Sequence, residues 1–505
     1  MICRNMFATV ALAALAAGCT ASQTAEGPSA ASFPALAGAD RCASVTAAML
    51  GASSASGKWV EEANGLPGFC EVTATLSPVS GSSIGVVYRL PASWNGKVLG
   101  FGGGGWIGNI ALQTASEGLR KGYATLQTDG GHPIGNVWDN SWAADPDKAK
   151  DFSYRAIHEM TVGGKRLVAA YYSQPHRRAY YQGCSTGGRM GLMEAQRYPD
   201  DYDLISAGAP VYTLQTQTSA VLRGQTFAKP GAAFTAADLQ LAQAASLNAC
   251  DADDGLKDGL INDPRQCGWD PAAIQCTGAK TESCLSAPQV AALRAAYAGV
   301  RAPDGEWAML PMSRGGEAGW AAFVGTSGAP DATNGGGLGG LWPLVFGSRP
   351  VDLPGMTLAD VQQVRRSEFA QWYEAKDADL RPFFRSGGKL LLWHGESDPG
   401  PSPVATNEYF RAVLARAPAA SSQARYFLDP GVGHCAGGPG ADQVAVLDAL
   451  EAWDDTGRAP EVLIGRKGNN NPLSRPHCAW PNVARYRGSG DANDAASWQC
   501  VRRTS

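Results

Sequence analysis

Ala179-Tyr-Tyr-Gln-Gly-Cys-Ser-Thr-Gly-Gly-Arg189 is the stretch that decides the fold of this chain. Its first five residues are typical of a short buried strand, and residues 186–198 have the apolar spacing of a helix. Between them, Gly183-Cys-Ser-Thr-Gly187 fits the Gly-x-Ser-x-Gly pattern of a sharp strand-to-helix turn that exposes a serine hydroxyl. The start of the helix points backbone N–H groups at the place where an oxyanion would develop if this hydroxyl attacked a carbonyl. A tight turn with a purely structural serine is the alternative interpretation.

Strand-like and helix-like segments alternate on both sides of this turn. Further predicted strands are residues 84–90, 97–102, 124–129, 204–208, 389–393 and 424–428. Further predicted helices are residues 155–172, 404–415 and 442–453. This alternation predicts an α/β fold in which helices cover both faces of a parallel sheet.

The alternation stops after residue 211 and resumes near residue 376. The segment between them, residues 212–375, contains helical pieces, an Asp-rich loop, several cysteines and Gly-rich stretches. We interpret this segment as an insertion. The α/β domain is therefore expected in two parts, residues 40–211 and residues 376–505.

Composition limits the classes of function. The chain has 505 residues, of which 17% are charged, and its net charge is −4 from 42 basic and 46 acidic residues. A globular protein fits these values, whereas a disordered chain or a coiled coil does not. Proteins that hold phosphate backbones usually carry a basic excess, so the balance argues against a nucleic-acid partner.

The N-terminus has the features of an export signal. Arg4 precedes an apolar run, residues 6–17, that is too short to span a bilayer. The run ends in Leu15-Ala-Ala-Gly-Cys19, which resembles a bacterial lipobox with Cys19 as the lipidated residue. Ordinary cleavage a few residues later is the alternative. We predict a signal peptide at residues 1–19, a flexible tether at residues 20–39, and a periplasmic, outer-membrane or secreted mature chain.

The cysteine count agrees with export. Ten of the twelve cysteines lie beyond the signal, and an exported chain with ten cysteines is expected to form five disulfides. The sequence alone does not fix their connectivity. The simplest guesses are the local pairs Cys42–Cys70, Cys250–Cys267, Cys276–Cys284 and Cys478–Cys500. They leave Cys184 and Cys435, which are far apart in the sequence.

A nucleophilic serine needs a base and an acid that orients the base. On α/β-hydrolase folds these residues follow one another in the order serine, acid, histidine. After Ser185, His434 lies in a Gly-rich loop between a predicted strand and a predicted helix, where this fold places the base. The acid should follow the preceding strand, which favours Asp398 over Glu396. His394, one residue past that strand, is ambiguous, and the remaining histidines fit surface or core positions better.

Cys184 and Cys435 flank the two residues of this candidate catalytic pair. Cys184 immediately precedes Ser185, and Cys435 immediately follows His434. A serine and its base lie about 3 Å apart, so their sequence neighbours would also be close. A disulfide between the two cysteines would tie the serine turn to the histidine loop and fix their relative positions.

Cys250-Asp-Ala-Asp-Asp-Gly-Leu-Lys-Asp-Gly-Leu-Ile-Asn-Asp263 is a second candidate site. Carboxylates interleaved with glycines suit a hard cation such as Ca²⁺. The stretch is not an EF-hand, because its glycine falls one place early and no glutamate closes the loop. A solvated acidic turn is the alternative.

With these motifs the chain resembles the tannase and feruloyl esterase family of secreted α/β hydrolases, which also includes mono(2-hydroxyethyl) terephthalate hydrolase. The resemblance covers about residues 40–500. Its most specific stretches are Phe152-Ser-Tyr-Arg-Ala-Ile-His-Glu-Met-Thr161, Gly183-Cys-Ser-Thr-Gly-Gly-Arg189, Glu194-Ala-Gln-Arg-Tyr-Pro-Asp-Asp-Tyr202 and Gly433-His-Cys-Ala-Gly-Gly-Pro-Gly440.

The resemblance implies an α/β-hydrolase fold in which the insertion, residues 212–375, forms a lid over the catalytic residues. It implies a Ser185, Asp398 and His434 triad joined by a Cys184–Cys435 disulfide, and it agrees with the four local cysteine pairs. The implied oxyanion donors are the backbone N–H groups of Thr186 and Gly105.

The resemblance also implies a structural calcium site in the insertion. The ligands would be the carboxylates of Asp251, Asp254 and Asp258 and the carbonyl oxygens of Leu256 and Leu260. The Cys250–Cys267 disulfide would hold the two ends of this loop together. No redox cofactor is implied.

The lid departs from the terephthalate-specific members, whose lid carries an arginine that holds the substrate carboxylate. Residues 315–348 contain no arginine, and Pro401 stands where those members have an aromatic residue beyond the acid. Specificity for a terephthalate half-ester is therefore doubtful. The lid aromatics either clamp a phenolic ring or form the lid core; they are Trp320, Phe323, Trp342 and Phe346.

The sequence predicts an exported serine carboxylesterase that acts on small esters of aromatic or phenolic acids, as feruloyl esterases do. A tannase or a mono(2-hydroxyethyl) terephthalate hydrolase is the alternative within the enzyme class. A catalytically silent binding lipoprotein on the same fold is the alternative outside it. Any membrane association would pass through the lipid on Cys19 alone.

Overall fold

The computed structural model describes residues 38–322, 336–468 and 470–503. The predicted signal peptide with Cys19, nearly all of the predicted tether, and Phe323 lie outside these residues.

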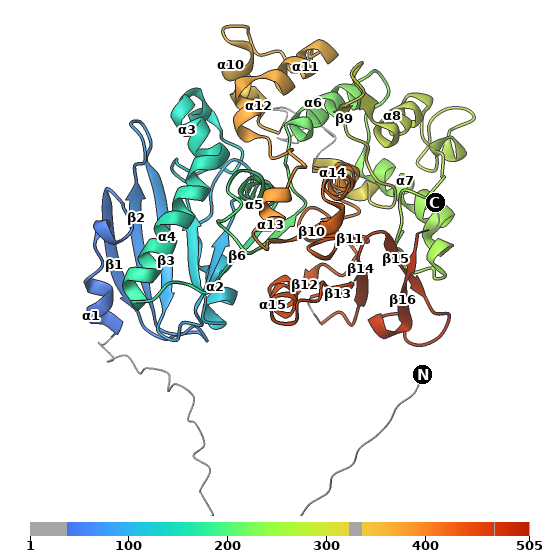
Figure 1. The fold of residues 1–505 in the computed structure, drawn as a ribbon. Helices are drawn as coiled ribbons and strands as arrows, with labels where there is room; N and C mark the ends of the chain where they lie inside the picture. Colours follow the sequence, from blue (N-terminus) through green and yellow to red (C-terminus); the bar gives the residue numbers. More distant parts are fainter. Residues whose placement is uncertain (1–37, 323–335, 469, 504–505) are drawn as a thin grey trace, which may run out of the picture. The chain divides into compact units, whose positions relative to one another are not determined.

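A nine-stranded sheet forms the centre of the described chain, with the strand order β1-β2-β3-β5-β4-β6-β7-β10-β11 (Figure 1). The strands are β1 (Ser54–Val60), β2 (Phe69–Leu76), β3 (Ile84–Pro91), β4 (Lys97–Phe101), β5 (Ala124–Thr128), β6 (Arg178–Cys184), β7 (Leu204–Gly208), β10 (Lys389–Gly395) and β11 (Ala424–Asp429). Neighbours from β5 to β11 pair in parallel, whereas β1, β2, β3 and β5 pair antiparallel. All seven strands predicted from the sequence are present, and β1 and β2 were not predicted.

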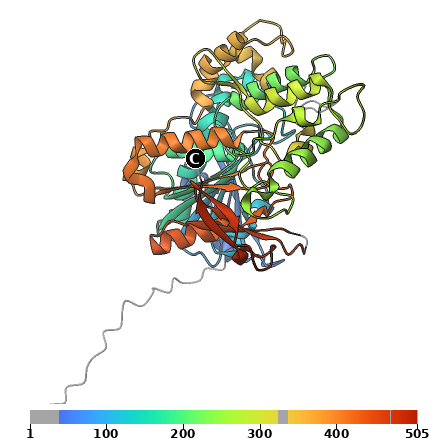
Figure 2. The same ribbon diagram turned by 90° about the vertical axis from the view of Figure 1, so that its right-hand side faces the viewer.

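Helices cover both faces of this sheet, as Figures 1 and 2 show. On β4, Val98 packs in the same apolar cluster as residues of α4 (Ala156–Tyr172), α5 (Thr186–Arg197) and α14 (Pro403–Arg416). The next residue, Leu99, packs with residues of α2 (Leu112–Arg120) and α15 (Val446–Thr456). Successive side chains of a strand point to opposite faces, so the two clusters are the two sides of the sheet.

The helix predicted at residues 442–453 begins later than expected. Gln443–Val444 form strand β12, and α15 starts at Val446. β12 pairs with β13 (Val462–Arg466), which pairs with β14 (Ser474–Cys478). β15 (Asn482–Tyr486) and β16 (Trp498–Arg502) form a separate hairpin. None of these C-terminal strands was predicted.

Between β7 and β10 the chain leaves the sheet and forms the inserted segment. Its helices are α6 (Gln215–Phe227), α7 (Ala236–Cys250), α8 (Ala287–Ala298), α10 (Leu338–Phe346), α11 (Leu358–Arg366) and α12 (Glu368–Tyr373), and its short strands are β8 (Val300–Arg301) and β9 (Trp307–Met309). α7 and α8 share an apolar cluster of their own, which includes Trp320. The part of the segment around α7 and α8 therefore has its own core, whereas α10, α11 and α12 pack in the same apolar cluster as the sheet.

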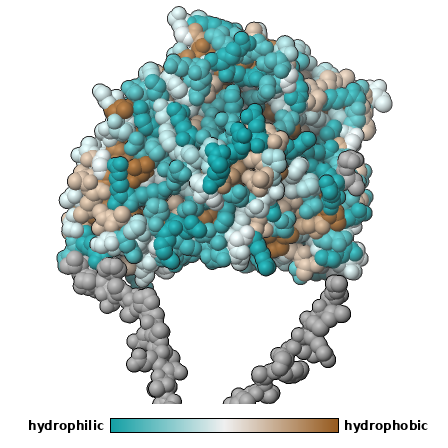
Figure 3. Space-filling model, viewed as in Figure 1, coloured by the Kyte–Doolittle hydropathy of each residue, from teal (hydrophilic) through white to brown (hydrophobic). Residues whose placement is uncertain are grey.

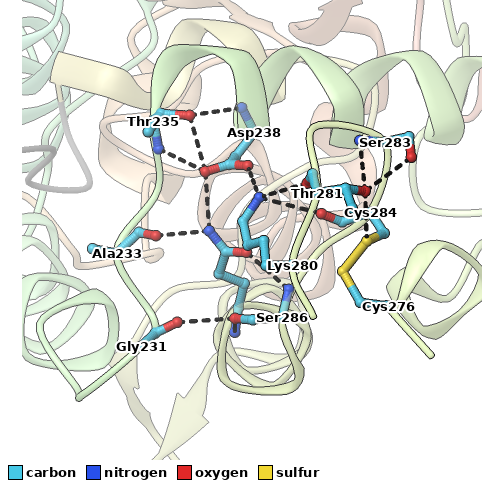
Figure 4. A network of polar contacts seen from close by, with 11 residues as sticks. Gly231, Ala233, Thr235, Asp238, Cys276, Lys280, Thr281, Ser283, Cys284 and Ser286 are labelled. Atoms are coloured by element: carbon cyan, nitrogen blue, oxygen red, sulfur yellow. Dashed lines mark hydrogen bonds and ion pairs between the residues drawn. A yellow bond between two sulfur atoms is a disulfide. The ribbon is translucent and has the colours of Figure 1, made fainter. Parts of the chain in front are cut away.

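A polar network joins α7 to α8 in this segment (Figure 4). Asp238, in the first turn of α7, accepts hydrogen bonds from Thr235, from Lys280 Nζ at 2.7 Å and from Gln289 of α8. Burial alone would raise the pKa of Asp238, but the hydrogen bond from Lys280 and those from Thr235 lower it below its ordinary value. The loop closed by Cys276–Cys284 carries Lys280, so this disulfide helps to hold the two helices together.

The structure contains the five disulfides in the expected pairing. They are Cys42–Cys70, Cys184–Cys435, Cys250–Cys267, Cys276–Cys284 and Cys478–Cys500. Hydrophilic residues dominate the face seen in Figure 3, with small hydrophobic areas between them. Among the described residues, no helix combines the length and the apolar character that a bilayer crossing requires.

Candidate active site

The serine turn lies between the end of β6 and the start of α5. Ser185 has φ 62° and ψ −125°, and its N–H donates to the carbonyl of Gly208 at 2.9 Å. A Cβ on Gly183 would lie 2.4 Å from backbone atoms of Gly187, and a Cβ on Gly187 would lie 2.8 Å from the carbonyl oxygen of Gly103. Only glycine fits these two positions, which explains the Gly-x-Ser-x-Gly spacing. The predicted strand–turn–helix is confirmed.

Ser185, His434 and Asp398 lie in one hydrogen-bonded line. His434 Nε2 is 2.8 Å from Ser185 Oγ, and His434 Nδ1 is 2.7 Å from Asp398 Oδ2. The three residues come from the β6–α5 turn, the loop after β11 and the loop after β10. The structure thus brings together the three residues proposed from the sequence. Ser185 and His434, which are in contact, are 249 positions apart in the chain.

Asp398 is fully enclosed and remains ionised. Burial alone would raise its pKa, but the adjacent rings of His434 and His394 outweigh burial and hold the pKa well below the ordinary value. Its Oδ1 accepts the N–H of Gly400 at 2.8 Å. A carboxylate in this state can orient His434 and stabilise the imidazolium that forms when His434 accepts a proton.

Glu396, the alternative acid, lies elsewhere. Its side chain is buried and accepts a hydrogen bond from Arg265 of the insertion at 2.6 Å. Of the remaining histidines, His477 pairs with Asp429 in the C-terminal region, and His132 stacks on Trp142.

The two expected oxyanion donors lie beside Ser185. Thr186 begins α5, and its hydroxyl donates to the carbonyl oxygen of Gly105 at 2.6 Å, which holds the Gly102–Gly105 loop against the helix start. Gly104 N–H and Trp106 N–H donate to backbone carbonyls. Among the described residues, the Gly105 N–H between them has no acceptor. Thr186 and Gly105 both line the cavity above Ser185.

The Cys184–Cys435 disulfide connects the turn that carries Ser185 to the loop that carries His434. Its Cα atoms are 6.0 Å apart, and both cysteines line the same cavity as the serine and the histidine. Cys435 has a φ of 62°, in the left-handed region. The bond therefore fixes a loop whose backbone is itself constrained, directly beside His434.

A cavity of about 340 Å³ opens over the serine. Its walls come from the Gly-rich loop after β4, residues 137–138, α6 of the insertion, and the loops that carry Asp398 and His434. Trp106 and Trp138 are the aromatic residues of the lining, and Pro401 lies at the same wall. The surface is largely apolar and suits an aromatic ring.

Of the two interpretations of the lid aromatics, the structure favours the lid core over the ring clamp for Trp320, Trp342 and Phe346. Trp320, Trp342 and Phe346 are buried within the insertion and do not line the cavity. They pack against other apolar side chains because each sits on the inner side of its helical segment. The sequence analysis missed Trp106 and Trp138; the position of Trp106 next to the expected oxyanion glycine was the available signal.

Arg223 of α6 is the arginine in this lining. Its guanidinium donates to the carbonyl oxygens of Pro399 at 2.8 Å, Gly400 at 3.1 Å and Leu310 at 3.2 Å. The side chain is 2% exposed. Arg223 thus joins α6 to the loop of the catalytic acid, and its donors are directed at the protein backbone.

The Asp-rich loop forms a compact turn at the end of α7. Asp251 accepts the N–H groups of Asp258 and Gly259 through its two oxygens, and Asp254 Oδ1 accepts the N–H of Leu256. Asp254 Oδ2 is buried without a hydrogen-bond partner. Burial raises the pKa of Asp254 to about 7, and the charges of Asp258 and Asp251 act in the same direction. Arg475 pairs with Asp258.

The ligand types of this loop suit a hard cation, but among the described residues the carboxylates of Asp251, Asp254 and Asp258 do not converge as a group within 4.8 Å of one another. The ligand types are carboxylate and backbone carbonyl oxygens, the ligands that Ca²⁺ takes in proteins. The unpartnered oxygen of Asp254 and the mutual repulsion of the carboxylates are the features that a bound cation would relieve.

A second cluster of potential metal ligands lies between α4 and α5. The carboxylates of Glu194 and Asp201 and a ring nitrogen of His158 all lie within 4.8 Å of one another. His158 Nδ1 is 2.6 Å from Asp201, and burial, then the charge of Asp201, raises the pKa of Glu194 well above its ordinary value. The cluster thus consists of a His158–Asp201 contact beside a buried carboxyl group whose pKa is raised.

Comparison with known proteins places this chain among esterases. A sequence model of the family described as "Tannase and feruloyl esterase" matches residues 70–328 and 348–501. Mono(2-hydroxyethyl) terephthalate hydrolase of Piscinibacter sakaiensis is 34% identical over 86% of this chain and 85% of that protein. Feruloyl esterase B of Aspergillus niger is 30% identical over 86% of each chain.

A solved structure agrees with these relatives. The crystal structure of feruloyl esterase B from Aspergillus oryzae superimposes with a TM-score of 0.80 at 28% identity and covers 92% of this chain and all of that one. The α/β-hydrolase fold expected from the sequence is confirmed by this likeness.

Proposed function

The chain belongs to the tannase and feruloyl esterase family, whose members act on carboxylic esters, and we propose that it is a serine carboxylesterase for esters of aromatic, phenolic acids. The observation that carries the proposal is the hydrogen-bonded line from Ser185 through His434 to Asp398 below a largely apolar cavity of about 340 Å³.

The proposed reaction follows from this arrangement. Ser185 Oγ attacks the ester carbonyl carbon while His434 Nε2 takes the hydroxyl proton, and Asp398 stabilises the resulting imidazolium. The backbone N–H groups of Thr186 and Gly105 donate to the oxyanion of the tetrahedral intermediate. His434 returns the proton to the leaving alcohol. Water, activated by His434, then attacks the acyl-enzyme and releases the acid.

The lining of the cavity supports an uncharged aromatic acyl group. Trp138 is 38% exposed at the cavity and Trp106 lines it from a largely buried position, and the guanidinium of Arg223 is directed at three backbone carbonyls. A free carboxylate on the substrate ring would meet a largely apolar surface and would lose its hydration, because the guanidinium of Arg223 already donates to backbone carbonyl oxygens. We therefore propose phenolic acid esters in preference to terephthalate half-esters.

A panel of four esters tests this proposal: methyl ferulate, methyl gallate, mono(2-hydroxyethyl) terephthalate and p-nitrophenyl acetate. We expect the highest kcat/KM among the three aromatic acid esters for methyl ferulate. A preference for the gallate indicates a tannase, and a preference for the half-ester contradicts our reading of Arg223. Labelling of Ser185 by a fluorophosphonate separates an esterase from a silent binding protein.

We also propose that Asp251, Asp254 and Asp258, with the carbonyl oxygens of Leu256 and Leu260, hold a structural Ca²⁺. The unpartnered buried oxygen of Asp254 supports this assignment. So does the Cys250–Cys267 disulfide, which closes the loop at both ends. The ion would stabilise the insertion.

Chelation is expected to lower the melting temperature. A site filled at about 1,000 times its Kd adds about 4 kcal/mol to the folded state, which corresponds to about 5 °C for a chain of this size. Thermal unfolding with EGTA and after addition of Ca²⁺ measures the effect. Asp254→Asn should remove the response to EGTA. Purified protein that contains no calcium by metal analysis and does not respond to EGTA contradicts the site.

Finally, we propose that the mature chain is exported, with Cys19 as the lipidation site. The five disulfides support an oxidising compartment. The binding partner of the mature protein would be its substrate, a small aromatic ester.

A further inference from the structure

His394 is a buried histidine that touches the proposed catalytic acid and takes no part in the reaction described above. Its Nε2 lies 3.1 Å from Asp398 Oδ2, the same oxygen that His434 Nδ1 contacts at 2.7 Å. Its Nδ1 lies 2.8 Å from Thr406 Oγ1 of α14. One carboxylate oxygen therefore lies between two imidazole rings.

The neighbours of His394 fix which nitrogen carries its proton. Nε2 faces Asp398 Oδ2 and, at 3.3 Å, the carbonyl oxygen of Pro401, and both of these are acceptors. Nε2 must therefore be the donor. In the neutral ring Nδ1 is then an acceptor, and the hydroxyl of Thr406 supplies the hydrogen bond to it.

The charged groups around this contact come from three parts of the chain. Glu396 precedes Asp398 on the same loop and pairs with Arg265 of the insertion. Arg223 of α6 donates to the carbonyl oxygens of Pro399 and Gly400 in that loop. Asp398 Oδ2 itself is contacted by His394 Nε2 and by His434 Nδ1.

We propose that His394 is a positioning residue for Asp398, with Thr406 as the group that sets its tautomer. The proposal rests on the esterase mechanism proposed above. The Nε2–H of His394 holds Oδ2 in line with His434 Nδ1, while the N–H of Gly400 holds Oδ1. The His394 hydrogen bond also withdraws negative charge from Oδ2. Asp398 therefore stabilises the His434 imidazolium less than it would without this second donor.

Replacement of His394 by Phe removes the donor and keeps a ring of similar size. We expect kcat to fall by about 10-fold or more, because a small displacement of a catalytic group is costly. KM should change by less than about twofold, since His394 does not line the cavity. In the pH profile of kcat/KM, the acid limb should move to higher pH. Without the His394 donor, Oδ2 keeps more negative charge, which raises the pKa of the neighbouring His434.

Two substitutions of Thr406 provide a second test, with smaller expected effects on kcat than His394→Phe. Thr406→Val keeps the shape of the side chain but cannot donate to Nδ1, so it should shift kcat and the acid limb in the same directions by a smaller amount. Thr406→Ser restores the hydroxyl and should restore the wild-type profile. This pair carries the test if His394→Phe does not fold.

Tyr426→Phe is the matched control for packing. The Tyr426 hydroxyl donates to the carbonyl oxygen of Pro403, the first residue of α14, at 3.2 Å, and Tyr426 is fully buried. It should lower stability without moving the acid limb. An acid limb that stays in place in both His394→Phe and Thr406→Val overturns the positioning role, even where stability falls. Failure of the wild-type protein to hydrolyse any ester overturns the mechanism itself.

Discussion

Ser185→Ala is expected to reduce kcat by at least about 10⁴-fold, the largest effect of any single change in this chain. The reason is geometric: Ser185 Oγ lies 2.8 Å from His434 Nε2, and α5 begins one residue later. Single-turnover kinetics with p-nitrophenyl acetate, together with fluorophosphonate labelling, measure the loss. Both acylation and labelling should disappear together.

His434→Ala should cost nearly as much as Ser185→Ala, and the double variant should cost little more, because the residues act as one unit. Ser206→Ala is the control: this buried serine accepts the indole N–H of Trp393, lies outside the triad, and the variant should keep its activity. Substantial turnover by Ser185→Ala contradicts a serine mechanism. A mild Asp398→Asn beside a severe Glu396→Gln contradicts only the identity of the acid.

The sheet was predictable where its strands are buried on both faces. Leu390, Leu391 and Leu392 of β10 are fully buried, and such strands read as continuous apolar runs. β1 is an edge strand with the sequence Ser-Ala-Ser-Gly-Lys-Trp-Val, whose side chains are exposed or half-buried. β1 is a strand because it pairs with β2, and its own sequence has no pattern from which a strand could be predicted.

The site was predictable to the extent that local motifs define it. Ser185 and His434 each lie in a loop with a recognisable sequence and position. The ring lining of the cavity was not predictable, because Trp106 and Trp138 reach it through loop conformations. Trp106 N–H donates to the carbonyl of Val137, which brings the two segments together. The contact of His394 with Asp398 likewise depends on how the chain turns after β10.

Loss of the Cys184–Cys435 bond should reduce activity beyond its effect on stability. The bond closes a loop of 251 residues, for which the chain-entropy model gives about 5.5 kcal/mol of stabilisation. Replacing both cysteines with Ala should lower the melting temperature. It should also reduce kcat per folded molecule by about 10- to 100-fold, because the Ser185 turn and the His434 loop lose their shared anchor.

The variant with Cys42 and Cys70 changed to Ala is the matched control for this prediction. That bond joins α1 (Gly38–Ala43) to β2, and neither cysteine lines the active-site cavity. The same model gives it about 3.6 kcal/mol, so the control should also be destabilised. Active sites counted by fluorophosphonate burst correct both variants for unfolded protein. Only the Cys184/Cys435 variant should have a reduced kcat per active site. Equal kcat values in the two variants would show that the bond is a structural crosslink that does not position His434.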